Sequence, residues 1–210
     1  MQCLLHFFVL GGFISKLLFQ GHGSYRITTD EGVIIYVDPY IGDGYDMEAD
    51  IILVTHEHYD HNKIELVKQK SDCVVIRYNT LKVGYIYNKT SIKGVEIEAV
   101  EAYNAKHDKN ACVGYVLRFD GLSVYCSGDT SRTDDMENKL STYSLDYALL
   151  PIDGIYNMDA KEASECAEII GAKHTIPIHM KPLELFDMES ALKFEHDSRL
   201  IVEAGKEIDL

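Results

Sequence analysis

Short apolar runs separated by turn clusters fill the first half of the chain. Runs at residues 16–20, 24–28, 33–37 and 51–54 have the length of β-strands, and Thr29-Asp30-Glu31-Gly32 is typical of a turn. Residues 63–69 instead place apolar side chains at helical spacing. This half is therefore predicted to be rich in strands, with one helix after the fourth strand.

The strand pattern continues through the middle of the chain. Strands are predicted at residues 73–77, 95–100, 113–119 and 122–126. Asp120-Gly121 separates the last two, and this dipeptide suits a hairpin turn that needs positive φ angles. The two strands are therefore expected to pair as a hairpin.

The second half adds helices to the scheme. Asp159-Ala-Lys-Glu begins a helix as a capping box, and Gly171 ends it. A shorter helix is predicted over 188–196. Strands are predicted at 145–150 and 175–178, and 200–202 is expected to pair with 207–210. Strands followed by helices in each half predict two sheets packed face to face, with helices outside.

The N-terminal segment, residues 1–15, does not fit this scheme. Its apolar run from 4 to 14 is interrupted by His6 and Gly11-Gly12, and no basic residue precedes it. It lacks the features of a secretory signal and is shorter than the ~20 residues of a membrane span. We interpret residues 1–15 as an apolar lead-in, either packed as an extra element or an artefact of the assumed start, and residues 16–210 as one domain. A membrane anchor is the less favoured alternative.

Charge and cysteine content narrow the choice of partner and compartment. The chain has 20 Lys+Arg against 34 Asp+Glu, a formal charge of −14, which disfavours nucleic acid and anionic membranes. A small anionic substrate stays open, because bound cations dominate the field inside a site. The five cysteines form no C-x-x-C pair, which predicts reduced thiols in a cytoplasmic protein.

A cluster of metal-ligand side chains follows the apolar run at 51–54. His56, His58 and Asp60 alternate along the chain and can project to one side at the strand's end, and His61 comes next. Imidazole and carboxylate together suit zinc, manganese or iron. Chance placement of four such side chains in six positions is the weaker interpretation.

The motif His56-x-His58-x-Asp60-His61 resembles the signature of the metallo-β-lactamase superfamily. Three further segments support the resemblance in order: His107, then Ser127-Gly128-Asp129-Thr130 after a strand, then His179 after Thr175-Ile-Pro-Ile. The resemblance covers residues 16–210 and implies the α+β fold of the superfamily, a four-layer αββα sandwich.

The resemblance also implies a dinuclear metal site. His56, His58 and His107 would hold the first ion, Asp60, His61 and His179 the second, and Asp129 would bridge the two. Two such ions share a water and lower its pKa to ~7, which generates a hydroxide nucleophile. Asp60 would also orient that nucleophile, and is the one side chain expected to be catalytic. The cofactors are therefore expected to be two divalent ions, zinc first and manganese or iron as alternatives.

Several residues near these motifs have two interpretations. Asp38 either hydrogen-bonds a ligand histidine or belongs to the turn before Pro39. His22 lies between two glycines. The family resemblance places it near the site, and the alternative is a hydrogen-bonded structural histidine. His6, His174 and His196 fit no motif. For Tyr59, Tyr156, Lys181 and Cys126 a structural or solvent-exposed role is favoured over contact with substrate or metal.

The small single-domain branch that includes ascorbate-6-phosphate lactonase-like and other metal-dependent hydrolases is the most similar. The segments behind this choice are Gln20-Gly-His22-Gly-Ser24, Val37-Asp38-Pro39-Tyr40, Leu150-Pro-Ile-Asp-Gly154 and Glu203-Ala-Gly205-Lys206. The expected activity is hydrolysis of a small ester, lactone or phosphodiester. A di-iron redox enzyme and a non-catalytic metal-binding sensor are the alternatives. A β-lactamase is disfavoured because Asp129 stands where zinc β-lactamases carry cysteine.

Overall fold

Two six-stranded sheets form the body of the protein. The computed structural model describes residues 14–210, so nearly all of the lead-in predicted for residues 1–15 lies outside the described residues, and the domain boundary at 16 stays a prediction. The first sheet has the strand order β14-β1-β2-β3-β4-β5. Its strands are β1 Lys16–Gly21, β2 Ser24–Thr28, β3 Ile34–Val37, β4 Ala49–Val54, β5 Gln69–Arg77 and β14 Lys206–Asp209.

The second sheet has the order β13-β12-β11-β10-β9-β8. Its strands are β8 Lys89–Ile92, β9 Val95–Val100, β10 Gly114–Phe119, β11 Leu122–Cys126, β12 Tyr147–Pro151 and β13 His174–Ile178. A separate small hairpin joins β6 Lys82–Val83 to β7 Ile86–Tyr87. The predicted hairpin between β10 and β11 is confirmed, with Asp120 at φ 51° and Gly121 at φ 77°.

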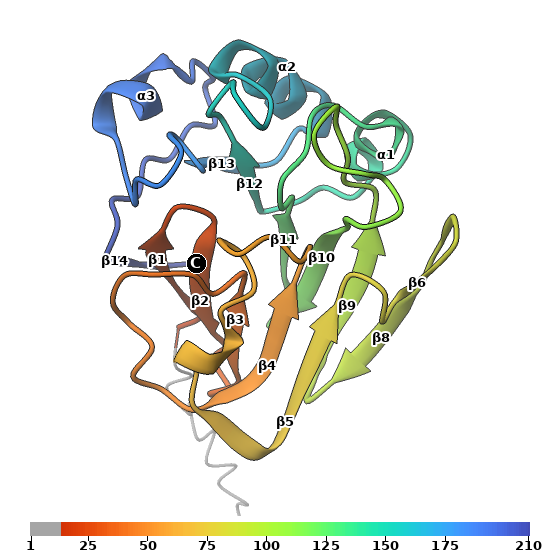
Figure 1. Cartoon of the computed structure of the whole chain (residues 1–210), viewed down its shortest axis with the longest axis vertical. Helices are drawn as coiled ribbons and strands as arrows, with labels where there is room; N and C mark the ends of the chain where they lie inside the picture. Colours follow the sequence, from red (N-terminus) through yellow and green to blue (C-terminus); the bar gives the residue numbers. More distant parts are fainter. Residues whose placement is uncertain (1–13) are drawn as a thin grey trace, which may run out of the picture.

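The main core lies between the two sheets. It is built from alternate side chains of both, such as Phe19 and Ile51 from the first and Leu117 and Leu149 from the second, all fully buried. A second core joins the outer face of the second sheet to helices α1 Asp134–Asn138, α2 Ala160–Ile170 and α3 Met188–Lys193. Figure 1 shows these helices gathered at one end of the molecule, with α2 next to β12. The predicted sandwich with outer helices is confirmed.

The outer layer on the first sheet is thin. A small third core there joins Tyr36, Ile52 and Val54 to Val67. Val67 directly follows the short 3₁₀-helix η1 Ile64–Leu66. The helix predicted over 63–69 is wrong beyond this single turn. Lys63 provides no side-chain cap, and Val67 is already extended because the chain enters β5, which pairs in parallel with β4.

Other predicted boundaries also change. The helix over 188–196 ends at Lys193, because Phe194 leaves helical geometry to enter the core. Residues 200–202 form no strand with 207–210. Instead Leu200 donates its backbone N–H to Thr175, and β14 pairs with β1. Sequence reasoning missed α1, β6, β7, β8 and the 3₁₀-helix η2 Leu140–Thr142. Among residues 14–210 no helix is long and apolar enough to cross a membrane.

The carboxyl ends of several strands meet at one edge of the sandwich. In the first sheet β3 and β4 run parallel, and β1 has the same direction because two antiparallel pairings separate it from β3. In the second sheet β11, β12 and β13 run parallel. The residues that follow these strands are therefore brought together, as at the ligand-binding edges of open parallel sheets.

Asp50 is a buried carboxylate that ties β4 to its surroundings. It accepts a hydrogen bond from the Ile34 backbone N–H at 2.9 Å and pairs with Lys70 and Lys93, both at 2.6 Å. Burial alone raises the pKa of Asp50, but the hydrogen bonds from Lys70 and Lys93 bring it below its ordinary value. The folded state therefore favours the charged form, and this stabilisation is lost as pH falls through the folded-state pKa.

We expect Asp50→Asn to destabilise the metal-free protein at pH 7 by about 1–2 kcal/mol, since both lysines lose a buried partner. The difference from wild type should shrink below about pH 4, where the unfolded carboxyl is protonated. Urea unfolding at pH 7 and at successively lower pH measures it. Asp72→Asn is the matched control, because Asp72 also pairs with Lys93 but its side chain is 67% exposed. An equal loss in both variants would contradict the burial argument.

Candidate metal centre

The carboxyl edge of the sandwich carries most of the predicted ligands. Thr55 and His56 follow β4, Asp129 comes shortly after β11, and His179 follows β13. His107 lies in the loop between β9 and β10. The structure thus brings together all seven side chains singled out in the sequence, and their ligand roles stay a prediction: His56, His58, Asp60, His61, His107, Asp129 and His179.

His56, His58 and His107 form a first convergent group. One ligand atom from each lies within 4.8 Å of the others. The Nε2 of His56 and the Nδ1 of His58 are 3.1 Å apart. Two donors bound to one tetrahedral zinc ion at 2.0–2.1 Å are about 3.3 Å apart, so this spacing fits a shared ion.

Asp60, His61 and His179 form a second group, and His22 joins them. Their four ligand atoms also lie within 4.8 Å of one another. His22 is 1% exposed, and its Nε2 is 3.3 Å from Asp60 Oδ2. The structure therefore places His22 in the site, in agreement with the interpretation based on resemblance.

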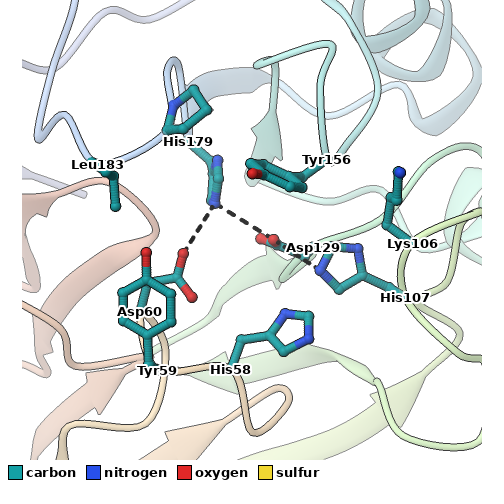
Figure 2. Close-up of a pocket in the computed structure, with 10 residues that line it drawn as sticks. His58, Tyr59, Asp60, Lys106, His107, Asp129, Tyr156, His179 and Leu183 are labelled. Carbon is teal, nitrogen blue, oxygen red and sulfur yellow. Dashed lines mark ion pairs between the residues drawn. The ribbon is translucent and has the colours of Figure 1, made fainter.

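Asp129 lies between the two groups. Its Oδ1 is 3.3 Å from His61 Nε2, and its Oδ2 is 3.3 Å from His107 Nε2 and 3.5 Å from His179 Nε2. Figure 2 shows His107 and His179 directed at this carboxylate from two sides. A carboxylate in contact with both groups has the position that a bridging ligand requires.

The donor set fits metal ions better than a network of hydrogen bonds. The Nε2 atoms of His61 and His179 are buried, and neither has a hydrogen-bond partner among the described residues. Buried polar nitrogens without partners are costly. Divalent ions would satisfy these nitrogens, and neutral imidazole and ionised carboxylate are the forms that bind zinc, manganese or iron.

Outer oxygen atoms fix the orientation of four of the histidines. Asp38 Oδ2 lies 2.9 Å from His61 Nδ1, which confirms the first interpretation of Asp38. The remaining Nδ1 contacts are His56 to Thr55 Oγ1 at 3.0 Å, His107 to Asn104 Oδ1 at 3.0 Å and His179 to Asp153 Oδ2 at 2.8 Å. An oxygen at Nδ1 leaves Nε2 free to face the site, as in most metal-binding histidines.

Asp153 and Asn104 were missed as functional residues. Asp153 stands in the segment Leu150-Pro-Ile-Asp-Gly154, which resembles the corresponding segment of the family. Its position after β12, among parallel strands, was the usable signal. Asn104 lies three residues before His107 in a loop, and only the folded loop brings its side chain back to the histidine ring.

The pKa values of the histidines in the site are shifted in different directions. Burial lowers the pKa of His56 well below its ordinary value and also lowers that of His58, so both are held neutral. Burial alone lowers the pKa of His61 too, but Asp129 and Asp38 raise it to about 9. Asp129 itself has a strongly lowered pKa despite burial, because His61 and His179 favour its charged form. In the absence of metal, the second donor group therefore holds a proton on His61, and this proton is released when a metal ion binds.

The backbone is strained where the site is built. His22, Asp38 and His179 have φ angles of 57°, 45° and 46°, in the left-handed region that non-glycine residues seldom adopt. Gly23 permits a close approach, since a Cβ there would lie 2.9 Å from His61 Cε1. Gly128, at φ 61°, likewise leaves no room for a Cβ beside Thr55.

A cavity of 390 Å³ opens onto the metal-ligand side chains. Its wall is formed by Tyr59, Lys106, Tyr156, Pro182 and Leu183. Figure 2 shows the two tyrosines and Leu183 around Asp60 and His179, with Lys106 beside His107. Tyr59 and Tyr156 are about half exposed and line the cavity, so a ligand bound there can reach both side chains.

Of the other side chains weighed in the sequence, those that the structure describes lie outside the site. Lys181 pairs with Asp187 at 2.6 Å and lines a different pocket. Cys126 is fully buried in the main core, as predicted. His174 is exposed beside Tyr147, and His196 contacts Ser198. His6 lies outside the described residues.

Comparisons with known proteins agree with this geometry. A family model described as "Beta-lactamase superfamily domain" matches residues 16–179. A UPF0173 metal-dependent hydrolase of Thermococcus onnurineus is 32% identical over 190 residues, which cover 78% of this chain and 84% of the relative.

Two crystal structures extend the comparison. A metal-dependent hydrolase from Parabacteroides distasonis is 32% identical, with a TM-score of 0.74 and coverage of 90% of this chain and 93% of that one. A protein from Thermotoga maritima, described as a Zn-dependent hydrolase of the metallo-β-lactamase superfamily, is 25% identical with a TM-score of 0.62. The match covers 80% of this chain and 77% of that one.

Proposed function

The chain belongs to the metallo-β-lactamase superfamily and is a metal-dependent hydrolase, and from this premise we propose that it cleaves a small ester, lactone or phosphodiester at a two-metal centre. The observation that carries the proposal is the pair of convergent donor groups with Asp129 between them. His56, His58 and His107 would hold one ion, and Asp60, His61 and His179 the other. We propose zinc for both, with manganese and iron as alternatives.

The protein's own side chains set up the reaction at this centre. Divalent ions held by these residues would supply two things: a water acidified enough to act as a hydroxide nucleophile, and polarisation of the oxygen of the electrophile. Asp60 is the side chain we assign to catalysis. It lines the cavity, and in the metal-free protein its pKa lies below its ordinary value despite burial, because a hydrogen bond from His22 and the charge of His61 favour the carboxylate. The carboxylate is therefore ionised and accepts a hydrogen bond from the attacking water, which orients the nucleophile.

The cavity wall favours a small substrate with an apolar body and a negative charge. Tyr59, Tyr156 and Leu183 provide apolar and aromatic surface. Lys106 is the one cationic side chain of the wall, and no described carboxylate lies within ion-pair distance of its Nζ. The rest of the surface is strongly acidic, at −14 for the whole chain, so a long polyanion is disfavoured while a short anion can reach Lys106.

Elemental analysis of protein purified without added metal, combined with a substrate panel, tests the proposal. The panel holds bis(p-nitrophenyl) phosphate, a lactone series and p-nitrophenyl esters. We expect about two equivalents of metal and turnover that a chelator abolishes. Two equivalents without turnover on any substrate would count against hydrolysis of these classes. Iron with oxygen reduction would favour the redox alternative, and absence of metal after reconstitution would refute the two-metal centre.

The role of Lys106 is tested by a neutral side chain of similar length. We expect Lys106→Met to raise KM roughly fivefold for a carboxylate-bearing p-nitrophenyl ester, the size of one exposed ionic contact, and to leave KM for p-nitrophenyl acetate unchanged. Lys109→Met is the matched control, because Lys109 already pairs with Glu101 and is absent from the cavity wall. Equal changes for the charged and the neutral ester would contradict the assignment.

A further inference from the structure

His22 sits in the tight turn between β1 and β2, at the edge of the second donor group. Its side chain is fully buried, and its backbone is held in the left-handed region at φ 57°. The backbone N–H donates to Leu185 O at 2.7 Å, and the carbonyl accepts from His179 N at 2.8 Å. The turn thus fixes the His22 ring against the strand end that carries His179, with the two ring centroids 3.8 Å apart.

The contacts of the ring determine where its free lone pair points. Nδ1 lies 3.2 Å from the carbonyl oxygen of Glu184, which can only accept, so Nδ1 carries a proton. In the neutral ring Nε2 then bears a lone pair, and it faces Asp60 Oδ2 at 3.3 Å. Two acceptors at this distance need a cation between them or beside them. His56, His61, His107 and His179 have the same arrangement, with Nδ1 at an outer oxygen.

We propose that His22 Nε2 is a further ligand of the second metal ion, beside Asp60, His61 and His179. The support is the convergence of these four ligand atoms within 4.8 Å, the same limit that defines the group of His56, His58 and His107. The inference rests on the proposed two-metal centre and adds a donor to it.

The competing explanation is a protonated His22 that donates to both Glu184 and Asp60. It satisfies the two contacts, but it places a positively charged ring, with a side-chain exposure of 0%, next to a divalent ion. Repulsion between two buried cations at such short range is strong. With the ion bound, the neutral ring with Nε2 directed inward is therefore the favoured form.

Cobalt(II) loading provides a direct count of coordinated histidines. The unpaired electrons of cobalt shift the ring N–H protons of bound imidazoles far outside the ordinary proton range, and these signals disappear in deuterated water. The two convergent groups contain six histidines, His22, His56, His58, His61, His107 and His179. We expect six such signals in the dicobalt protein and five in His22→Asn. Asparagine tolerates a positive φ and lacks an atom at the position of Nε2.

Metal affinity gives a second readout. We expect His22→Asn to weaken the binding of the second cobalt ion at least about tenfold in competition with a chromophoric chelator. Tyr40→Phe is the matched control: Tyr40 packs against the His22 ring at a centroid distance of 5.4 Å, and the variant should keep six signals and the wild-type affinity.

The outcomes separate this inference from the proposed function. Two cobalt ions with five shifted signals in the wild type, unchanged in His22→Asn, would overturn His22 as a ligand and leave the two-metal centre intact. Binding of a single cobalt ion would overturn both. The wild-type count alone decides between six and five ligands if the variant does not fold.

Discussion

Replacement of Asp129 by asparagine is expected to abolish hydrolysis while the fold survives. The change removes the negative charge and turns one carboxylate oxygen into an amide group that cannot bind a metal. Asp129 contacts His61, His107 and His179, so both donor groups lose their common partner. Electrostatic stabilisation by a metal centre is worth several kcal/mol, and a loss of about 4 kcal/mol corresponds to ~1,000-fold in kcat/KM.

Metal content and turnover on the best substrate of the panel measure this effect. We expect Asp129→Asn to retain at most one tightly bound equivalent of metal. Asp146→Asn is the control, since Asp146 precedes β12 at the opposite end of the same sheet, where it accepts hydrogen bonds from Ser123. That variant should keep two equivalents and full activity. Two equivalents in Asp129→Asn with near wild-type turnover would refute the bridging role.

The sequence predicts the sandwich because its hydrophobic pattern is local and strong. Apolar runs such as those of β3, β4 and β12 are buried in the structure over their whole length. The Asp120-Gly121 hairpin and the capping of α2 by Asp159 depend on neighbours in the chain. Features set by distant partners were predicted wrongly. The strand predicted at 207–210 pairs with β1 across nearly the whole chain and not with 200–202, and residues 63–69 become extended because β5 pairs with β4.

The same division holds for the site. His56, His58, Asp60 and His61 stand in one short motif, and the other predicted ligands end strands or follow them, so type and spacing predict them. The outer partners carry no such pattern. Asp153 reaches His179 only because β12 and β13 lie side by side, and Asn104 reaches His107 only through its loop. His22 could not be assigned from the sequence, because its role depends on where the ring points after β1 has folded.

Asp38 links the sheet to the second donor group, which makes its amide variant informative. Its Oδ1 accepts from the Thr55 backbone N–H at 2.7 Å, and its Oδ2 accepts from Thr55 Oγ1 at 2.6 Å and from His61 Nδ1 at 2.9 Å. In Asp38→Asn the side-chain oxygen continues to accept the hydrogen bond from the Thr55 backbone N–H, so the amide N–H₂ faces His61 Nδ1. Two donors cannot share that contact, and the proton of His61 moves to Nε2, which removes the lone pair aimed at the metal.

We therefore expect Asp38→Asn to lower the affinity for the second metal ion by about 100-fold and to lower kcat/KM by a similar factor at subsaturating metal. Asparagine accepts the φ of 45° at this position, so the metal-free fold should survive, as circular dichroism and urea unfolding will show. Asp50→Asn is the matched comparison, a buried aspartate of the same sheet whose partners are lysines and a backbone amide. It should lose stability and keep both ions. If Asp38→Asn also loses only stability, with both ions bound as tightly as in wild type, then Asp38 supports the sheet and not the histidine.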